Sequence, residues 1–494
     1  MRASPTVVSL AVGLLYLAFA TEPLSSDSAS PTEQAVSIYI THLTLIDTQS
    51  GRESRDQTVV ISGDRITAVT NSRDAKPQPG DKVVDGTGKY VIPGLWDMHV
   101  HTWKYASTYP LYIANGITGV REMFGPPDAN AFRAELASKR VLAPRMYIAS
   151  PIIDGHPRVW PESIEVADAD EARRVVREQK IKGADFIKAY SRLSRESYFA
   201  IIDESHRLGL PVDGHVPSQI TAWEASDAKQ RSFEHLNGIA MACSTREEEL
   251  KPKLNATTVI RERYRVMAQA TRSYSPEKCS RLFARLRANE NWQVPTLTVL
   301  RSFGLLNDPQ FRDDNRIRYF GGKYREWLTA KDDFRMKDWE AADFAIQREI
   351  YAFSQKLVGE VFRAGVPILA GTDTGNPYCF PGFSLHDELA LLVESGLTPL
   401  AALRSATVDP AKFMNASDRY GSVASGKIAD LVLLDADPLA DIHNTTRIAA
   451  VFLSGKHFDR AALDQLLKEA QTAAKSASGE LRKETQVGNY RLEN

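Results

Sequence analysis

This chain of 494 residues has few cysteines, almost no net charge and few long apolar runs. Three cysteines are too few for a disulfide scaffold, and 43% hydrophobic with 25% charged residues is ordinary globular composition, which also sets aside disordered and collagen-like classes. The 61 Lys and Arg residues nearly balance the 62 Asp and Glu residues, and no basic run stands out. The composition therefore argues against nucleic acid or an anionic membrane as a partner. The length suits one large domain plus a smaller one.

A short apolar run occurs at the N-terminus, between Val7 and Ala20. Arg2 gives it a positive start, and Ala18-Phe19-Ala20 places small residues where a signal peptidase cleaves. The run is too short to span a bilayer comfortably. Residues 1–20 therefore predict a signal peptide, export to the periplasm or the medium, and no membrane attachment after cleavage. An uncleaved N-terminal anchor helix is the alternative.

Export would place the three cysteines in an oxidising compartment. Cys243 and Cys279 flank one charged segment and could close a loop on each other, which would leave Cys379 free. Three unpaired, buried thiols are the alternative, because spacing along a sequence gives no distance between side chains.

Both ends of the chain carry short β-rich segments. They are rich in β-branched residues and are separated by turn signals such as Ser62-Gly63-Asp64. The segments are residues 39–47, 57–61, 65–70, 429–434 and 449–453. We therefore expect a small β-sandwich domain built jointly from residues 34–92 and 416–460.

The middle of the chain, residues 93–415, alternates candidate strands with helix-like stretches. The helix-like stretches include residues 170–181, 195–208 and 385–395. The candidate strands are residues 91–101, 118–122, 145–150, 185–190, 211–215, 232–235, 294–300 and 367–373. Eight strands with intervening helices predict an α/β fold, a closed (β/α)8 TIM barrel.

Two longer charged segments, about residues 240–292 and 301–353, interrupt the later repeats of the barrel. Their Arg- and Glu-rich faces with spaced Leu, Phe, Tyr and Trp predict helical insertions. Because they follow barrel strands six and seven, we expect them over the catalytic face. Residues 461–494 should form a C-terminal helix and a polar, loose tail from about Gln471.

Residues capable of metal chemistry gather where the expected barrel strands end. His99 and His101 lie two apart on one strand, so both imidazoles face the same side. Lys188 lies inside an apolar strand, where an ammonium is costly unless it is paired or chemically altered. Three further strands end in a histidine or a carboxylate, at His215, His235 and Asp373. Barrel enzymes place their chemistry at this face, and four histidines with a carboxylate suit a divalent ion such as zinc.

The order His-x-His, Lys, His, His, Asp resembles that of the binuclear, metal-dependent branch of the amidohydrolase superfamily. The resemblance extends over almost the whole chain and includes the sequences of residues 91–99 and 426–431. Residues 371–375, followed by residues 383–389, are similar to the Xaa-Pro dipeptidase-like and imidazolonepropionase-related members. This chain departs from those dipeptidases at Val216-Pro217-Ser218, where they tend to carry an aromatic hydroxyl.

The resemblance implies two divalent metal ions, with zinc the expected element. The more buried ion would be held by His99, His101 and Asp373, and the more exposed one by His215 and His235. Lys188 would be carboxylated by carbon dioxide and would bridge the two ions as a carbamate. If Lys188 is instead a plain lysine paired with Asp185, only one metal would bind tightly.

The resemblance also implies a mechanism, that of a metal-dependent hydrolase acting on a small-molecule substrate. Two ions that share a water lower its pKa and give a metal-bridging hydroxide. Asp373 would take the proton of this hydroxide and pass it to the leaving nitrogen. The expected reaction is hydrolysis of an amide-like C–N bond in a dipeptide or an N-acyl amino acid.

Two further residues are candidates for contact with the substrate. His156 lies in the loop after the third strand, where it could act catalytically by polarising a carbonyl or could be a solvated loop histidine. Tyr190 shares a strand face with Lys188, so it could bind substrate or simply pack.

Other functions also fit this set of residues. A lactonase or esterase would use the same site, because the attack step is identical. A non-catalytic metal- or ligand-binding protein is an alternative of another class, although binding alone needs no proton shuttle such as Asp373. Homo-oligomer formation is left open by the sequence.

Overall fold

The computed structural model describes residues 36–330, 333–336 and 338–476 of the chain. The predicted signal peptide, residues 1–20, and the end of the predicted tail lie outside the described residues. Among the helices that are described, none combines the length and the apolar character needed to cross a membrane.

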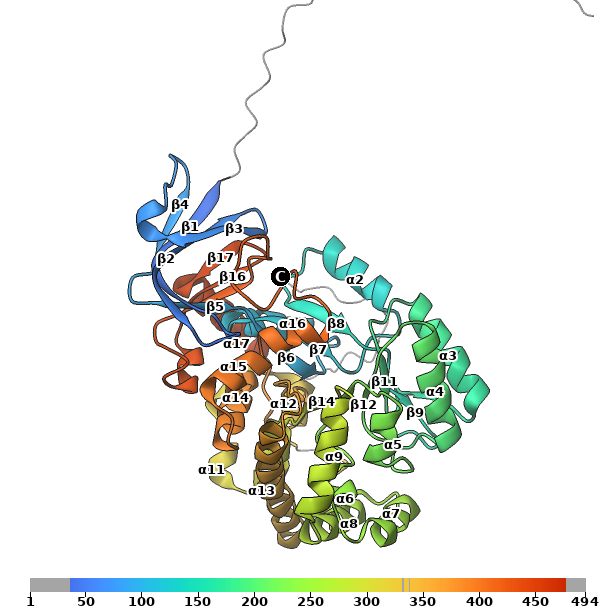
Figure 1. The fold of residues 1–494 in the computed structure, drawn as a ribbon. Helices are drawn as coiled ribbons and strands as arrows, with labels where there is room; N and C mark the ends of the chain where they lie inside the picture. Colours follow the sequence, from blue (N-terminus) through green and yellow to red (C-terminus); the bar gives the residue numbers. More distant parts are fainter. Residues whose placement is uncertain (1–35, 331–332, 337, 477–494) are drawn as a thin grey trace, which may run out of the picture. The chain divides into compact units, whose positions relative to one another are not determined.

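Strands from both ends of the chain pair in one eight-stranded sheet, and the blue and red strands of Figure 1 accordingly lie side by side. Its strands are β1 (Ser37–Ile46), β2 (Glu53–Ser62), β3 (Arg65–Asn71), β4 (Lys82–Asp85), β5 (Tyr90–Pro93), β15 (Leu431–Leu434), β16 (Ile448–Leu453) and β17 (Lys456–Asp459). Antiparallel pairing of β5 with β15 connects the N-terminal strands of this sheet to its C-terminal strands.

The sheet folds back on itself where its outer strand β3 meets the segment before β15. The amide of Ile66 donates to the carbonyl of Lys427, and the amide of Ala429 donates to the carbonyl of Asp64. A separate apolar core that includes Leu431 fills the space inside. The expected two-layered β domain is thus one continuous sheet, because a curled sheet buries one face without a second sheet.

Seven strands and one extended segment form the barrel predicted from the alternating pattern. The strands are β6 (Leu95–Val100), β7 (Ile117–Glu122), β8 (Arg145–Ile148), β11 (Ile187–Ala189), β12 (Val212–Gly214), β13 (Ser232–Glu234) and β14 (Trp292–Val294). The eighth member, residues 367–374, joins β14 by a parallel bridge at Ile368 and β6 by one at Thr374. A further parallel bridge, from Ala149 to Phe186, links β8 to β11. Every member therefore has two parallel neighbours, as a closed barrel requires.

The helices of the repeats begin at capping residues that the sequence supplies. Asp168, Ser194 and Thr221 each accept a backbone N–H through the side chain at the start of a helix. The helices of the barrel repeats are α1 (Tyr109–Ala114), α2 (Ala129–Ser138), α3 (Ala169–Ile181), α4 (Arg195–Arg207), α5 (Ala222–Asp227), α14 (Ser384–Glu394), α15 (Pro399–Ser405) and α16 (Val408–Phe413). Two short strands, β9 (Ile153–Asp154) and β10 (Ile164–Glu165), lie in the loop after β8.

Both predicted insertions are helical in the structure. The first contains α6 (Ile239–Ala242), α7 (Glu247–Ala256), α8 (Ile260–Arg272) and α9 (Pro276–Ala288). The second contains α10 (Leu297–Leu305), α11 (Pro309–Arg312), the short helix η3 (Asn315–Tyr319), α12 (Gly322–Leu328) and α13 (Ala341–Arg363). A disulfide joins Cys243 to Cys279 within the first, and Cys379 is free and buried. Of the two cysteine alternatives, the structure has the pair.

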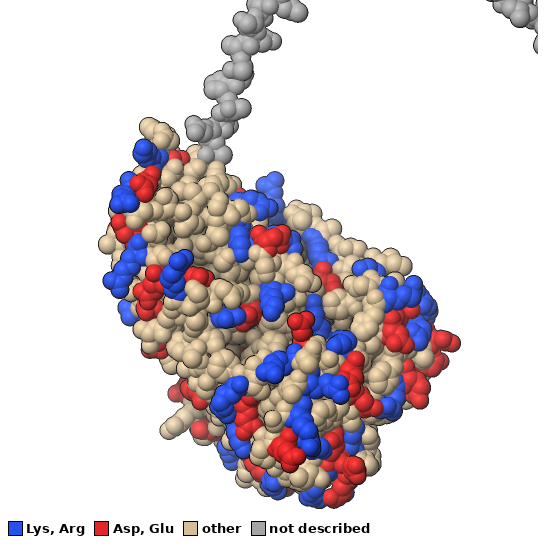
Figure 2. Space-filling view, viewed as in Figure 1, with Lys and Arg blue, Asp and Glu red and all other residues tan. Residues whose placement is uncertain are grey.

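Two sequence expectations are corrected. The strand expected at residues 294–300 ends at Val294, and α10 begins at Leu297. The tail expected to be loose from about Gln471 is helical as far as Ser476, the end of α17 (Arg460–Ser476). On the face drawn in Figure 2, basic and acidic side chains are interspersed and no large area of one sign stands out.

Candidate metal centre

Three of the expected ligands converge at one end of the barrel. His99 and His101 extend from the C-terminal end of β6, and Asp373 from the end of the eighth member. Asp373 Oδ1 lies 2.9 Å from His101 Nε2 and 3.4 Å from His99 Nε2. Ligand atoms of all three residues lie within 4.8 Å of one another, the spacing of a site that could hold a metal ion.

The two other expected histidines lie beside this cluster. His215 follows β12 and His235 follows β13, and their rings are perpendicular with centroids 5.0 Å apart. The His235 ring is 4.8 Å from the His99 ring, and its Nδ1 is 3.9 Å from Asp373 Oδ2. The side chains from four different strands thus form one contiguous group.

Lys188 lies in the middle of β11 and is 1% exposed. The alternative in which it pairs with Asp185 is absent, because the Asp185 carboxylate binds Arg133 and the amide of Ile148, each at 2.6 Å. Within the described part of the chain, the ammonium of Lys188 makes no hydrogen bond or ion pair. Its charged form is therefore buried without a direct partner, and the carboxylates of Glu234 and Asp373 offset that cost only from a distance.

Three of the four imidazoles are held through Nδ1 by an oxygen of the protein. The pairs are His99 with Glu234 at 2.8 Å, His215 with Ser191 at 2.7 Å, and His235 with Thr296 at 2.6 Å. The Thr296 hydroxyl itself donates to the carbonyl of Pro295, so it accepts from the His235 ring. Fixing Nδ1 in this way leaves Nε2 as the ligand atom, the usual arrangement around a bound metal.

A buried ion network lies beneath His99. Arg121 donates to both carboxylate oxygens of Glu234 at 2.9 Å and to Asp213 at 3.2 Å, and Asp213 also pairs with Arg231. Arg121, Asp213 and Glu234 are fully buried. Because Arg121 binds both oxygens of Glu234, this carboxylate is fixed in place and in turn fixes the orientation of the His99 ring.

Burial and charge set the protonation of the group. Burial lowers the pKa of His99, His215 and His235, which keeps the imidazoles neutral and able to bind a cation. Burial lowers the pKa of Lys188 to about 8, although nearby carboxylates oppose this. Burial alone would raise the pKa of Asp373, but the surrounding imidazoles lower it below its usual range.

Unusual backbone conformations occur at two of the expected ligands. His235 and Asp373 have φ values of 59° and 55°, in a region that side chains other than glycine seldom occupy. Gly214, just before His215, has a φ of 129°, and a Cβ there would lie 2.2 Å from the carbonyl oxygen of Ala189. Such strain is held at functional sites by surrounding contacts, here including the Asn376 side-chain amide on the carbonyl of Asp373 at 2.9 Å.

Aromatic side chains stand around the mouth of this centre. Tyr190, the sequence candidate for substrate binding, stacks on the His215 ring with centroids 4.1 Å apart. Its hydroxyl accepts a hydrogen bond from Trp160 Nε1 at 2.9 Å, and Trp160 lies in the loop after the third strand. From the second insertion, Trp327 Nε1 donates to the carbonyl of Gly375 at 2.5 Å.

The other candidate, His156, lies in the same loop as Trp160 but at the surface. Its side chain is 77% exposed, and Nδ1 pairs with Glu165 at 2.9 Å. The structure therefore does not bring His156 together with the ligand group. His386, assigned a structural place from the sequence, is buried and bonds to the carbonyl of Asn115 at 3.0 Å.

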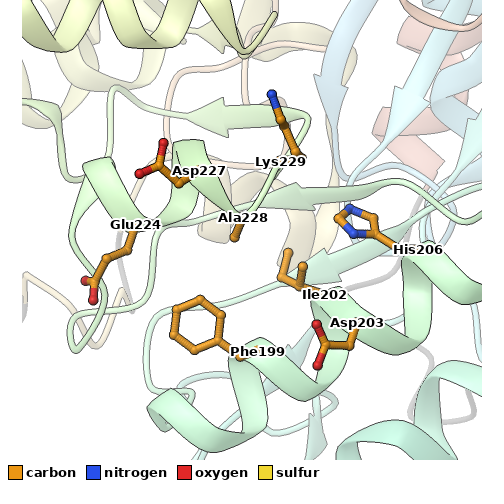
Figure 3. Close-up of a pocket in the computed structure, with 8 residues that line it drawn as sticks. All are labelled: Phe199, Ile202, Asp203, His206, Glu224, Asp227, Ala228 and Lys229. Carbon is orange, nitrogen blue, oxygen red and sulfur yellow. The ribbon is translucent and has the colours of Figure 1, made fainter.

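A separate pocket lies on the outside of the barrel, between α4 and α5 (Figure 3). It is wide open and measures about 470 Å³. None of the predicted site residues lines it; its lining residues are Phe199, Ile202, Asp203, His206, Glu224, Asp227, Ala228 and Lys229.

The residues at the strand ends fit a divalent cation. His99 Nε2 is sealed from solvent and has no hydrogen-bond partner among the described residues, although it faces a carboxylate oxygen. Neutral imidazoles and one ionised carboxylate form a nitrogen and oxygen donor set that zinc accepts. A buried imidazole nitrogen without a partner costs free energy, and a metal ion would remove that cost.

Several residues at the centre could not be singled out from motifs. Glu234, Ser191 and Thr296 bind the ligand rings, and Trp160 and Arg335 lie at the mouth. One signal was present for the buried network, since Arg121, Asp213 and Glu234 are charged residues inside expected barrel strands. No comparable signal marks Arg335, which lies in a charged insertion.

Comparisons with known proteins agree with this geometry. Residues 351–457 match the model of the amidohydrolase family. An imidazolonepropionase from Streptococcus gordonii is 33% identical over 97 residues, which is 19% of this chain and 30% of that relative. This chain thus matches less than a third of the length of that relative.

Two solved structures share the fold over most of the chain. Bottromycin amidohydrolase superimposes with a TM-score of 0.72 at 24% identity, covering 88% of this chain and 90% of its own. A Xaa-Pro dipeptidase with bound methionine gives 0.62 at 19% identity, covering 86% of this chain and 100% of its own. The chain thus resembles the amidohydrolase family over residues 351–457 and shares its overall fold with these two solved structures.

Proposed function

We propose that this chain is an exported metal-dependent amidohydrolase that hydrolyses an amide-like C–N bond in a dipeptide or an N-acyl amino acid. The observation that carries the proposal is the convergence of His99, His101 and Asp373, with His215 and His235 beside them. A protein that only binds metal needs no proton-transferring carboxylate, and Asp373 lies among His99, His101 and His235.

Two metal ions would be held by the residues already described. His99, His101 and Asp373 would hold the more buried ion, and His215 and His235 the more exposed one. When bound, the ions supply an activated water and polarise the scissile carbonyl.

The bridging anion would come from Lys188. Its amine would react with carbon dioxide and lose a proton, giving a carbamate with one negative charge. This assignment is supported by the burial of Lys188 without an ion-pair partner in the described part of the chain. It would exchange a buried ammonium that has no direct partner for an anion close to neutral imidazoles.

The two oxygens of Asp373 have different surroundings, which suggests a division of work. Oδ1 is sealed from solvent and turned to His99 and His101. Oδ2 is left to take a proton from the attacking water and to deliver it to the leaving nitrogen. His235 Nδ1, which donates to Thr296, keeps its own proton away from Oδ2.

Export is supported by the N-terminal sequence and by the disulfide between Cys243 and Cys279, since such bonds persist in oxidising compartments. The partner we propose is a small molecule, because the reacting group lies at the mouth of a barrel that a second macromolecule would enter only through an extended segment.

The test is turnover by the mature protein after removal of metals and reconstitution with zinc and bicarbonate. The panel contains dipeptides, N-acyl amino acids and lactones. We expect release of free amine from C–N substrates by the reconstituted protein and none by the metal-stripped protein. His443→Ala serves as the control variant, because the exposed His443 side chain bonds to Asp441 alone among the described residues.

Two outcomes would contradict the proposal. Turnover of lactones or esters alone would move the reaction to a C–O bond. Tight metal binding with no turnover of any substrate would favour a binding protein.

A further inference from the structure

We propose that Arg335 anchors the carboxylate of the substrate, beside an aromatic wall that receives a large apolar side chain. The substrate class is then an N-acyl amino acid or dipeptide whose C-terminal residue is aromatic or otherwise large and apolar. This inference rests on the proposed hydrolysis of a C–N bond and specifies which substrate enters the site.

Arg335 reaches the mouth of the centre from the second insertion. Its NH1 donates to the Asn376 side-chain oxygen at 2.8 Å, and the Asn376 side-chain amide binds the carbonyl of Asp373. The guanidinium also lies 5.5 Å from the ring centres of both Trp160 and Trp327. Trp160 donates to the hydroxyl of Tyr190, and Trp327 donates to the carbonyl of Gly375. Both indoles beside Arg335 are therefore bonded to residues that lie next to the expected metal ligands.

The guanidinium is fixed in place but not fully used. Asp333, whose side chain is fully buried, accepts from Nε at 2.9 Å and from NH2 at 2.6 Å. With the bond to Asn376, three of its five N–H groups have partners among the described residues, and two remain. The Arg335 side chain is 13% exposed, so part of it faces solvent. A preorganised guanidinium with free donors is suited to a carboxylate.

The wall beside Arg335 is aromatic and partly open to solvent. Phe334 is 50% exposed, and its ring centre lies 5.5 Å from that of Trp160. Trp160 in turn lies 6.2 Å from Trp327 in an edge-on arrangement. An exposed phenylalanine next to a cation that has unused donors forms a surface for a ligand with one anionic and one apolar group.

A matched arginine in the same insertion distinguishes a binding role of Arg335 from a purely structural one. Arg316 makes the same paired contact with the aspartate two positions before it, Asp314. The NH1 group of Arg316 donates to Asp387 at 2.8 Å, so Arg316 pairs with two carboxylates of the protein. Arg335 has one carboxylate partner and lies at the mouth, which is the difference that a substrate carboxylate would use.

The experiment measures binding of two probes to the zinc-loaded protein by calorimetry. The probes are 3-phenylpropanoate and 3-phenylpropan-1-ol, which differ in the anionic group and contain no bond to hydrolyse. We expect the wild type to prefer the carboxylate by about tenfold or more, since a charge-assisted pair is worth that much. Arg335→Gln should abolish the preference with unchanged zinc content, and Arg316→Gln should retain it.

A second variant covers the case in which Arg335→Gln fails to fold. Phe334→Ala removes an exposed side chain, and we expect it to weaken both probes equally by several-fold while the carboxylate preference remains.

The inference is overturned if the wild type binds neither probe or binds both equally, or if Arg335→Gln keeps the preference, which would assign it to the metal ions. Selective binding without hydrolysis of any C–N substrate would contradict the proposed function and leave the anion site standing. Hydrolysis of a C–N substrate without a preference for the carboxylate probe would support the proposed function and contradict the anion site at Arg335.

Discussion

The floor and the mouth of the candidate site are built in different ways. On the floor, His99, Lys188 and Glu234 are almost entirely buried and emerge from barrel strands. At the mouth, Trp160 lies in a loop and Phe334 is half exposed in an insertion. The barrel can therefore keep one chemistry while loops and insertions determine which molecule reaches it.

The largest expected effect concerns Asp373, which lies between the pair His99 and His101 and the more exposed His235. Asp373→Asn keeps the size of the side chain but removes the base, so we expect kcat to fall by about 10³-fold. Steady-state kinetics with the best substrate of the panel measures this. Unchanged turnover with a full metal complement would contradict the assigned proton transfer.

Lys188→Ala removes the proposed bridging anion. We expect loss of at least one metal ion per chain and a fall in kcat of about 10²-fold or more. Propionate added to the variant should restore part of both quantities, because a small carboxylate would supply the missing anion. A variant with normal metal content and turnover would show that Lys188 is no ligand.

Glu234→Gln tests the second layer of the floor. The change weakens the hold on the His99 ring and unbalances Arg121, so we expect a 10- to 100-fold weaker metal affinity, roughly the cost of losing such a partner. Competition with a chelator gives the dissociation constant. If affinity is unchanged while thermal stability falls, Glu234 serves only the buried ion network.

The smallest effect on the reaction is expected from the first insertion. Replacing Cys243 and Cys279 by serine opens a loop with a sequence separation of 36, which should lower the free energy of unfolding by about 2–4 kcal/mol. Metal content should not change, because the floor is built without this loop. Chemical denaturation and metal analysis of the same preparation measure the two quantities. Coupled loss of metal would show that floor and insertions are not independent.

The floor was accessible from the sequence because its geometry follows from strand periodicity. His99 and His101 share a strand face by their spacing alone. The match of residues 351–457 to the amidohydrolase family agrees with the resemblance seen in the sequence. The barrel is confirmed too, since apolar strands alternate with helices that begin at recognisable caps.

Long-range contacts explain the failures. Residues 294–300 have the apolar, β-branched composition of a strand, yet Thr296 turns the backbone with a φ of 49° and a helix follows. The first amides of that helix, those of Leu297 and Thr298, bond to Glu388, about ninety positions later in the chain. Arg335 is similar, because its place depends on how an insertion packs over the barrel. No local pattern encodes such contacts.

We propose that the strand ends hold two metal ions. The most direct test is the zinc content of the mature protein, measured by elemental mass spectrometry after reconstitution with zinc and bicarbonate. We expect about two zinc ions per chain. A protein that stays metal-free, or that binds a single ion at saturating zinc, would contradict it.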